Sequence, residues 1–189
     1  MRGRALVLAW MGCLALMPGC APLVVTGVGT SALMAEDRRT AGTVVDDDSI
    51  EAKVSFKVSE HYGRDTHVDV TSFNRVVLLA GAVTSEAAKQ DIERIARTTE
   101  NVRAVQNELT VGPVPSVAAQ AHDAYITSKI KAHFLDAGRF YPNHVKVDTE
   151  AGTVYLMGLV KHQEADAATD IARSVDGVVK VVRIFEYID

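Results

Sequence analysis

The sequence predicts an α+β fold in which one small module occurs twice in tandem. Apolar residues recur in the order helix-strand-strand-helix-strand over residues 46–112 and again over 121–189. The repeat is close, because Ile50 and Ile126, which open equivalent stripes, lie 76 residues apart. In an α+β module of this order, we expect two helices to pack on one face of a small three-stranded sheet.

Residues 1–19 have the pattern of an export signal. Arg2 and Arg4 precede an apolar run of about a dozen residues, which is shorter than the roughly 20 needed for a permanent membrane span. The run ends at Gly19 and Cys20, which resembles the lipobox where bacterial lipoproteins are cleaved and acylated. We therefore expect Cys20 to carry a diacylglycerol and an N-acyl chain such as palmitate, with no other cofactor. The alternative is a secreted protein with one spare thiol.

Charge and cysteine content exclude several kinds of function. The formal net charge is −4, and it becomes −6 once the signal and its two arginines are removed, so the protein is a poor candidate for nucleic-acid binding. Any contact with anionic lipid must come from a local basic patch. With Cys13 lost in the signal and Cys20 acylated, no thiol remains for disulfides, thiolate catalysis or cysteine metal sites.

The segment 20–45 is expected to be a tether, because it is small and apolar without a sustained period. The first module is expected to begin with a helix at the acidic run 46–49, where carboxylates and hydroxyls suit a helix N-terminus. Ile50, Val54 and Val58 then form one apolar stripe. The later elements are a strand through Val68 and Val70, a turn at Asn74, a strand over 76–81, a helix opened by Ser85, and a strand with Val102, Val105 and Leu109.

Pro113 and Pro115 interrupt both helix and strand patterns, so residues 113–120 are expected to be a linker. The second module repeats the first. Its elements are a helix capped by Asp123 with the stripe Ile126, Ile130 and Phe134, a hairpin that turns at Gly152, a helix over 163–174, and a closing strand with Val178, Val179, Val181 and Ile184.

Nothing in the sequence indicates an enzyme. There is no Gly-x-Ser-x-Gly motif and no motif that joins serine to histidine, so we expect no catalytic residues and no small-molecule substrate. We also expect no metal site, because no two of the six histidines have ligand spacing within one element. Solvated surface histidines are the simpler interpretation. Gly81 and Gly158 are expected to be structural.

The first helix of the second module carries the candidate binding face. Alignment of the repeats places Tyr125 where the first module has Ser49, and this position points away from the core stripe. An exposed aromatic ring beside lysines suits the headgroup region of an anionic membrane. The alternative is that Tyr125 packs against the first module or the linker, with Phe140 and Tyr141 as core or loop residues. The expected phospholipid-binding residues are Tyr125, Ser128, Lys129, Lys131, Ala132 and Leu135.

A family resemblance rests on the segments 81–83 and 158–160, on the helices after them, and on the closing pairs. The closing pairs are the valines of the last strand expected in each module, Val102 with Val105 and Val178 with Val181. These residues resemble the BON domain, a bacterial module of exported proteins. The order of signal, tether and two modules resembles outer-membrane lipoproteins of the DolP type and, less closely, soluble periplasmic proteins of the OsmY type.

This resemblance implies a non-enzymatic lipoprotein on the periplasmic face of the outer membrane. It implies that the second module binds anionic phospholipid and that the protein helps to keep the envelope intact, with a role in envelope stress. Envelope proteins are possible further partners. The alternative is a periplasmic protein-interaction adaptor, whose sheet faces or edges recruit an envelope enzyme or assembly factor.

Overall fold

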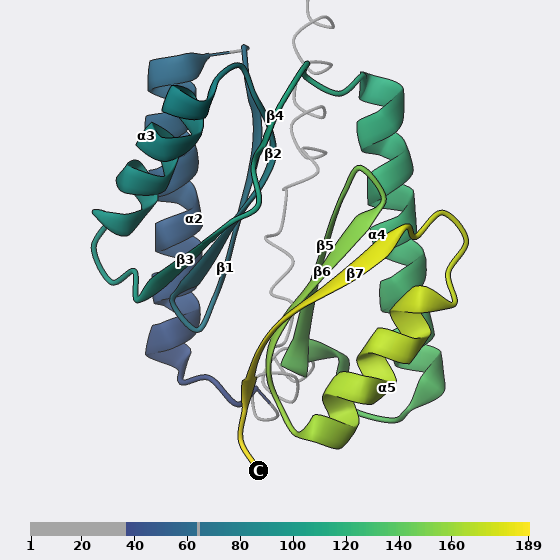
Figure 1. Cartoon of the computed structure of the whole chain (residues 1–189). Coiled ribbons are helices and arrows are strands. Elements are labelled where there is room, and N and C mark those ends of the chain that lie inside the picture. Colours follow the sequence, from purple (N-terminus) through teal and green to yellow (C-terminus); the bar gives the residue numbers. More distant parts are fainter. Residues whose placement is uncertain (1–36, 64) are drawn as a thin grey trace, which may run out of the picture.

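The computed structural model describes residues 37–63 and 65–189 (Figure 1). The signal at 1–19, Cys20 and most of the expected tether lie outside the described residues. The first module comprises α2 (Ala41–Tyr62), β1 (His67–Phe73), β2 (Val76–Val83), α3 (Glu86–Arg97), β3 (Ala104–Asn107) and β4 (Thr110–Val111). The second comprises α4 (Val117–Ala137), the 3-10 turn η1 (Pro142–His144), β5 (Val145–Glu150), β6 (Thr153–Val160), α5 (His162–Arg173) and β7 (Lys180–Tyr187).

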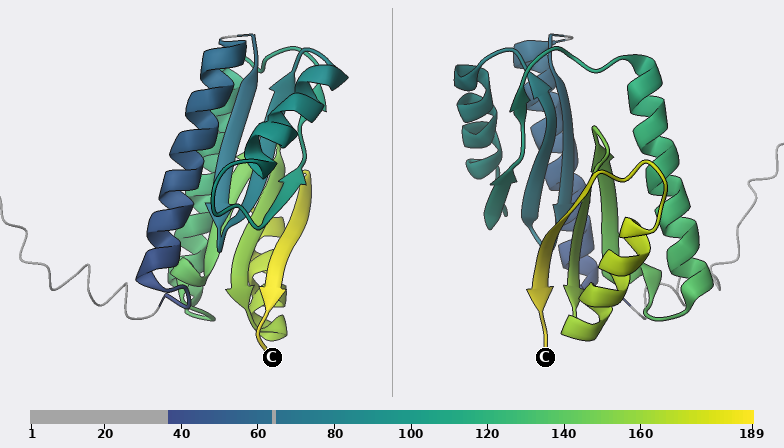
Figure 2. Two further views of the ribbon diagram at one scale, coloured as in Figure 1. Left: turned by 90° about the vertical axis from the view of Figure 1, so that its left-hand side faces the viewer. Right: turned by 45° about the vertical axis from the view of Figure 1, so that its right-hand side comes forward.

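The two modules form four layers, with two sheets face to face between two pairs of helices (Figures 1 and 2). In each module the helices cover the outer face of the sheet, so the expected α+β module is confirmed. The first core is built from the Ile50, Val54 and Val58 stripe packed on β2 and α3. The second core uses the equivalent stripe of α4, which includes Ile126 and Phe134.

A third apolar cluster joins the inner faces of the two sheets. Phe73, Leu78 and Ala80 of the first module pack with Tyr155 and Met157 of the second, and all five are buried. Neither sheet therefore offers a free face, because each covers the other. The sheet faces therefore cannot recruit a partner protein, as one form of the adaptor hypothesis required. Recruitment through the sheet edges remains possible.

The hairpins follow the expected turns, whereas the closing strand of the first module is interrupted. Strands β1 and β2 pair antiparallel, and β3 and β4 both pair parallel with β2. Between them, the Asn107 side chain accepts a hydrogen bond from the backbone N–H of Leu109 at 3.2 Å, a local bond that competes with the ladder. Leu109 turns into the helix core, whereas Val102 precedes the strand. In the second module, Val178 and Val179 also precede the strand.

Both expected helix starts are wrong, because each helix begins several residues earlier. Helix α2 starts at Ala41, and the Thr40 hydroxyl accepts a hydrogen bond from the Thr43 N–H, so residues 41–45 are helical and not tether. Helix α4 starts at Val117 with Ser116 as its N-cap, which shortens the linker. Ser85 caps α3 as expected. No helix within 37–63 or 65–189 has the length and hydropathy of a membrane span.

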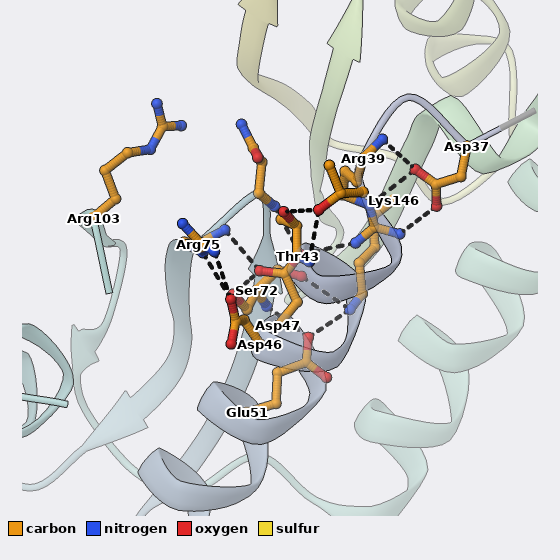
Figure 3. A network of polar contacts seen from close by, with 12 residues as sticks. Asp37, Arg39, Thr43, Asp46, Asp47, Glu51, Ser72, Arg75, Arg103 and Lys146 are labelled. Carbon is orange, nitrogen blue, oxygen red and sulfur yellow. Dashed lines mark hydrogen bonds and ion pairs between the residues drawn. The ribbon is translucent and has the colours of Figure 1, made fainter. Parts of the chain in front are cut away.

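Asp47, expected near the helix start, is buried and holds the hairpin of its module (Figure 3). Its carboxylate accepts the Asn74 and Arg75 backbone N–H groups at 2.8 and 2.7 Å, the Ser72 hydroxyl at 2.7 Å and the Arg39 guanidinium at 2.9 Å. Asn74 and Arg75 both have positive φ, as a two-residue type I′ turn requires. The carboxylate therefore ties the helix to the turn.

Asp123 does the same in the second module. It is buried, and it accepts the backbone N–H groups of Ala151 and Gly152 at 2.9 and 3.0 Å. Both turn residues again have positive φ. The duplication has therefore preserved a buried carboxylate for each hairpin, and neither aspartate is a helix cap.

Gly81 and Gly158 sit where two strands of a hairpin approach closely. A Cβ at Gly81 would lie 2.1 Å from the His67 carbonyl oxygen, and one at Gly158 would lie 2.3 Å from the His144 carbonyl oxygen. Gly81 also has a φ of +125°, which L side chains rarely adopt. Their role is structural.

Two arginines that precede α2 connect both modules. Arg39 bonds Asp47 and lies over the Phe73 ring, with its guanidinium carbon 4.1 Å from the ring centroid. Arg38 bonds both carboxylate oxygens of Glu164 in α5 at 2.6 and 2.8 Å, and also the Leu159 carbonyl. The hydrogen bonds from Arg38 hold the pKa of Glu164 below its usual range. The chain thus enters the fold already attached to each module.

Candidate lipid-binding face

Four of the six residues expected to bind phospholipid, Tyr125, Ser128, Ala132 and Leu135, lie on the face of α4 opposite its buried stripe, and Lys129 and Lys131 lie on the two flanks of that face. Tyr125 is 59% exposed and Leu135 is 69% exposed. Ser128, Lys131 and Ala132 are also exposed, and Lys129 is half-buried. At the N-terminal end of the helix, Val117 extends the same face and is 82% exposed.

The polar groups on this face have few competing partners among the described residues. The Lys129 ammonium lies 5.6 Å from the centroid of the Tyr125 ring, a cation-π arrangement that keeps aromatic and positive charge together. The Ser128 hydroxyl is less free, because it donates to the Ala124 carbonyl of its own helix at 2.8 Å. Tyr125 and Lys129 are therefore the best-placed pair for a headgroup.

The structure decides between the alternative positions that the sequence left open for Tyr125, Phe140 and Tyr141. Tyr125 does not pack into the first module or the linker, since more than half of its surface is exposed. Phe140 is a core residue, buried with its ring edge-on to Phe134 at 4.9 Å. Tyr141 is 53% exposed, near the C-terminal end of α4, and the sequence did not single it out as a binding residue.

The first module has its own exposed aromatic residue, which weakens the contrast drawn from Ser49 and Tyr125. Phe56 is 67% exposed on α2, at the repeat position of Ala132. The lysine equivalent to Lys129 is Lys53, which pairs with Glu100 at 3.5 Å. The two helices therefore differ in one respect. On α4 an exposed ring, Tyr125, lies beside Lys129, which has no carboxylate partner among the described residues, whereas Lys53 on α2 is paired with Glu100.

A polar cluster lies between the modules, at the edge formed by β1 and β5, and the sequence did not reveal it. His67 Nε2 is 3.3 Å from Glu150 Oε2 and 3.7 Å from Asp69 Oδ2. Burial, followed by the charge of Asp69, raises the pKa of Asp148 to about 6. We name these four residues the seam cluster.

Two histidines depart from the expected solvated surface positions. His67 is half-buried in the seam cluster, and its side chain is only 20% exposed. His144 is buried beneath the exposed ring of Tyr141, with the ring centroids 5.4 Å apart. Sequence spacing could not show either position, because the packing partners come from distant segments.

Comparison with known proteins identifies the class of protein that this fold defines. The family model of the BON domain matches residues 46–113 and 122–188, which is most of the chain and both modules. The chain therefore belongs to the BON-domain family.

Individual members of known families are also similar to this chain in sequence. Outer membrane lipoprotein DolP of Haemophilus influenzae is 36% identical over 181 residues, which cover 95% of this chain and 94% of that protein. The 21 kDa hemolysin of Actinobacillus pleuropneumoniae is 34% identical, with 80% and 79% covered. Osmotically-inducible protein Y of Escherichia coli is 37% identical, with 74% and 72% covered. The expected resemblance to proteins of the DolP type and of the OsmY type is confirmed.

Proposed function

We propose that this protein is an outer-membrane lipoprotein, anchored through acylated Cys20, whose second module binds anionic phospholipid and helps to maintain the envelope. The periplasmic face is the proposed location. A relative aligned over nearly its whole length is named an outer membrane lipoprotein, which supports the location. The observation that carries the binding role is the exposed pair of Tyr125 and Lys129 on a helix face with no protein partner in the described residues.

The energetics favour a weak contact that the anchor makes effective. A basic side chain near an anionic surface contributes on the order of 1 kcal/mol, and the face offers Lys129 and Lys131 with Arg139 beyond the helix end. An unanchored module would bind weakly through so few charges. Two or more acyl chains hold the protein at the membrane, so a high effective concentration compensates for low intrinsic affinity.

The path of the chain also suits this arrangement. Arg38, the second described residue, bonds Glu164, whose carboxylate lies 3.9 Å from His144, and His144 packs against Tyr141. The first described residues therefore lie against the second module, near the C-terminal end of α4. An anchor at this end brings Leu135 and the rest of the face toward the bilayer.

Substitution of this face is expected to weaken vesicle binding. In the full chain carrying Cys20→Ala, so that no acyl chain contributes, Lys129→Glu should reduce affinity for phosphatidylglycerol vesicles by at least tenfold, because it replaces an attractive charge of about 1 kcal/mol with a repulsive one. Tyr125→Ala should reduce it by several-fold through the loss of the interfacial ring. Sedimentation with vesicles measures both.

Matched controls come from the first module. Lys53→Glu and Phe56→Ala change the same residue types on α2 and should leave vesicle binding as in the unsubstituted chain. Binding should also fall with added salt and on vesicles of zwitterionic phosphatidylcholine, which carry no net charge. If the α2 variants lose as much binding as the α4 variants, the assignment to the second module is wrong.

The anchor is tested separately. Cells grown with labelled palmitate should incorporate label into the wild type and not into Cys20→Ala, and the variant should move from the membrane fraction to the soluble periplasmic fraction. Unchanged fractionation together with an unlabelled wild type would show that the protein is held by other means.

A protein-interaction adaptor is the second candidate, and one observation favours it. The edge strands β3 and β7 border an open cleft of about 450 Å³, lined by side chains that include Arg103, Gln106, Arg183 and Glu186. Strand edges can recruit an extended segment of a partner. If lipid-blind variants still maintain the envelope whereas Gln106 or Arg183 variants do not, the adaptor is the better account.

A further inference from the structure

The seam cluster brings together one donor group from each of three side chains. One nitrogen of His67 and one carboxylate oxygen each of Asp69 and Glu150 all lie within 4.8 Å of one another. The two carboxylates come from different modules, since Asp69 is in β1 and Glu150 in β5. The imidazole distinguishes this group from an ordinary patch of acidic residues.

A third carboxylate lies beside these three side chains, and one of its buried oxygens has no hydrogen-bond donor among the described residues. Asp148 lies two residues before Glu150 on the same face of β5, and its buried Oδ2 atom accepts no hydrogen bond among the described residues. The nearest cation on the strand, Lys146, is committed to Glu51 and to the Ser72 carbonyl. Lys131, an exposed residue of α4, acts on Asp148 through its charge. An unpartnered buried carboxylate oxygen beside two further carboxylates is costly unless a cation is close.

We infer that the seam cluster binds one divalent transition-metal ion, of the class of Zn²⁺, through His67, Asp69 and Glu150, with Asp148 as a nearby anionic group. A set of one imidazole and two carboxylates suits Zn²⁺, which accepts nitrogen and oxygen ligands at about 2.0–2.2 Å. Ca²⁺ and Mg²⁺ prefer ligand sets made entirely of oxygen. This binding site is independent of the proposed lipid-binding face.

The geometry requires little movement to hold an ion. Ligand atoms around a tetrahedral Zn²⁺ are separated by about 3.3–3.5 Å, which follows from the bond lengths. The His67 nitrogen already lies 3.3 Å from Glu150 and 3.7 Å from Asp69. The Asp69 side chain is 49% exposed, so it can rotate inward and leaves a route for the ion and for a water ligand.

An ion at this position would join the modules. Its ligands come from β1 and β5, which belong to different sheets, so binding would resist separation of the sheets at their polar edge. Ligand binding to the folded state alone raises its stability.

Metal titration of the full chain tests the inference. Protein without an affinity tag is purified in detergent, stripped with a chelator and titrated with Zn²⁺ by calorimetry, with its thermal midpoint measured in parallel. We expect one Zn²⁺ per chain and a higher thermal midpoint with Zn²⁺, and much weaker binding of Ca²⁺ and Mg²⁺. Replacement of Zn²⁺ by Co²⁺ should give a visible spectrum that reports nitrogen and oxygen ligands.

Two variants and one control make the test specific. His67→Asn and Glu150→Gln keep the shape of each side chain and should each weaken Zn²⁺ binding at least tenfold, with loss of the thermal shift. His162→Asn removes an exposed histidine that pairs with Asp189 outside the seam, and it should bind Zn²⁺ as the wild type does. Absence of Zn²⁺ binding by the wild type, or equal binding by His67→Asn, would overturn the inference.

Discussion

Asp47→Ala is expected to destabilise the folded protein by about 3–5 kcal/mol, the largest effect of any single aspartate substitution in the described residues. The substitution leaves two backbone N–H groups of the β1–β2 turn, the Ser72 hydroxyl and one Arg39 bond without their acceptor. The Asp47 carboxylate and the Ser72 hydroxyl are buried and the turn N–H groups are partly buried, so water replaces the carboxylate only in part. Urea unfolding followed by circular dichroism measures the loss.

Neighbouring and equivalent aspartates provide the controls. Asp48→Ala changes an exposed residue one position away and should alter stability by less than about 0.5 kcal/mol. Asp123→Ala removes two backbone bonds and no arginine partner, so about 1–3 kcal/mol is expected. Equal stability of the Asp47 and Asp48 variants would contradict the assigned role.

Gly81→Ala is expected to cost about 3 kcal/mol or more, because the added methyl group has no space. Its carbon would lie 2.1 Å from the His67 carbonyl oxygen and 2.9 Å from the carbonyl carbon, so β1 must separate from β2 at its first residue. The positive φ of Gly81 adds backbone strain. Thermal unfolding of the variant beside the wild type measures the combined cost.

Alanine substitutions at two other glycines serve as comparisons for Gly81→Ala. Gly158→Ala meets the His144 carbonyl oxygen at 2.3 Å without a positive φ, so its cost should be large but smaller than that of Gly81→Ala. Gly112→Ala has no atom within 4 Å of the new carbon and should be close to neutral. If Gly81→Ala unfolds at the temperature of Gly112→Ala, the close approach does not constrain the fold.

Local features of this fold could be predicted from the sequence because they depend on nearby residues. The stripe Ile50, Val54 and Val58 faces the core as its helical period requires, and Asn74 marks the turn of a two-residue hairpin. The exposed position of Tyr125 follows from the same periodicity. Because the module occurs twice in the sequence, each of its elements could be predicted from two independent segments.

Features that depend on distant segments could not be predicted. Three successive acidic residues resemble a helix start, yet Asp47 accepts bonds from residues 25 to 28 positions later, so its role exists only once the hairpin packs on the helix. The seam cluster joins His67 to Glu150 across 83 positions. Face-to-face packing of the sheets was equally hidden, because alternating strands predict a buried face without naming what buries it.

The two arginines before α2 determine how a mechanical load would pass through the molecule. Tension along the polypeptide from an anchored end reaches Arg38 and Arg39 first, and it divides there, through Glu164 into one half and through Asp47 into the other. Traction on this end would therefore load both halves together.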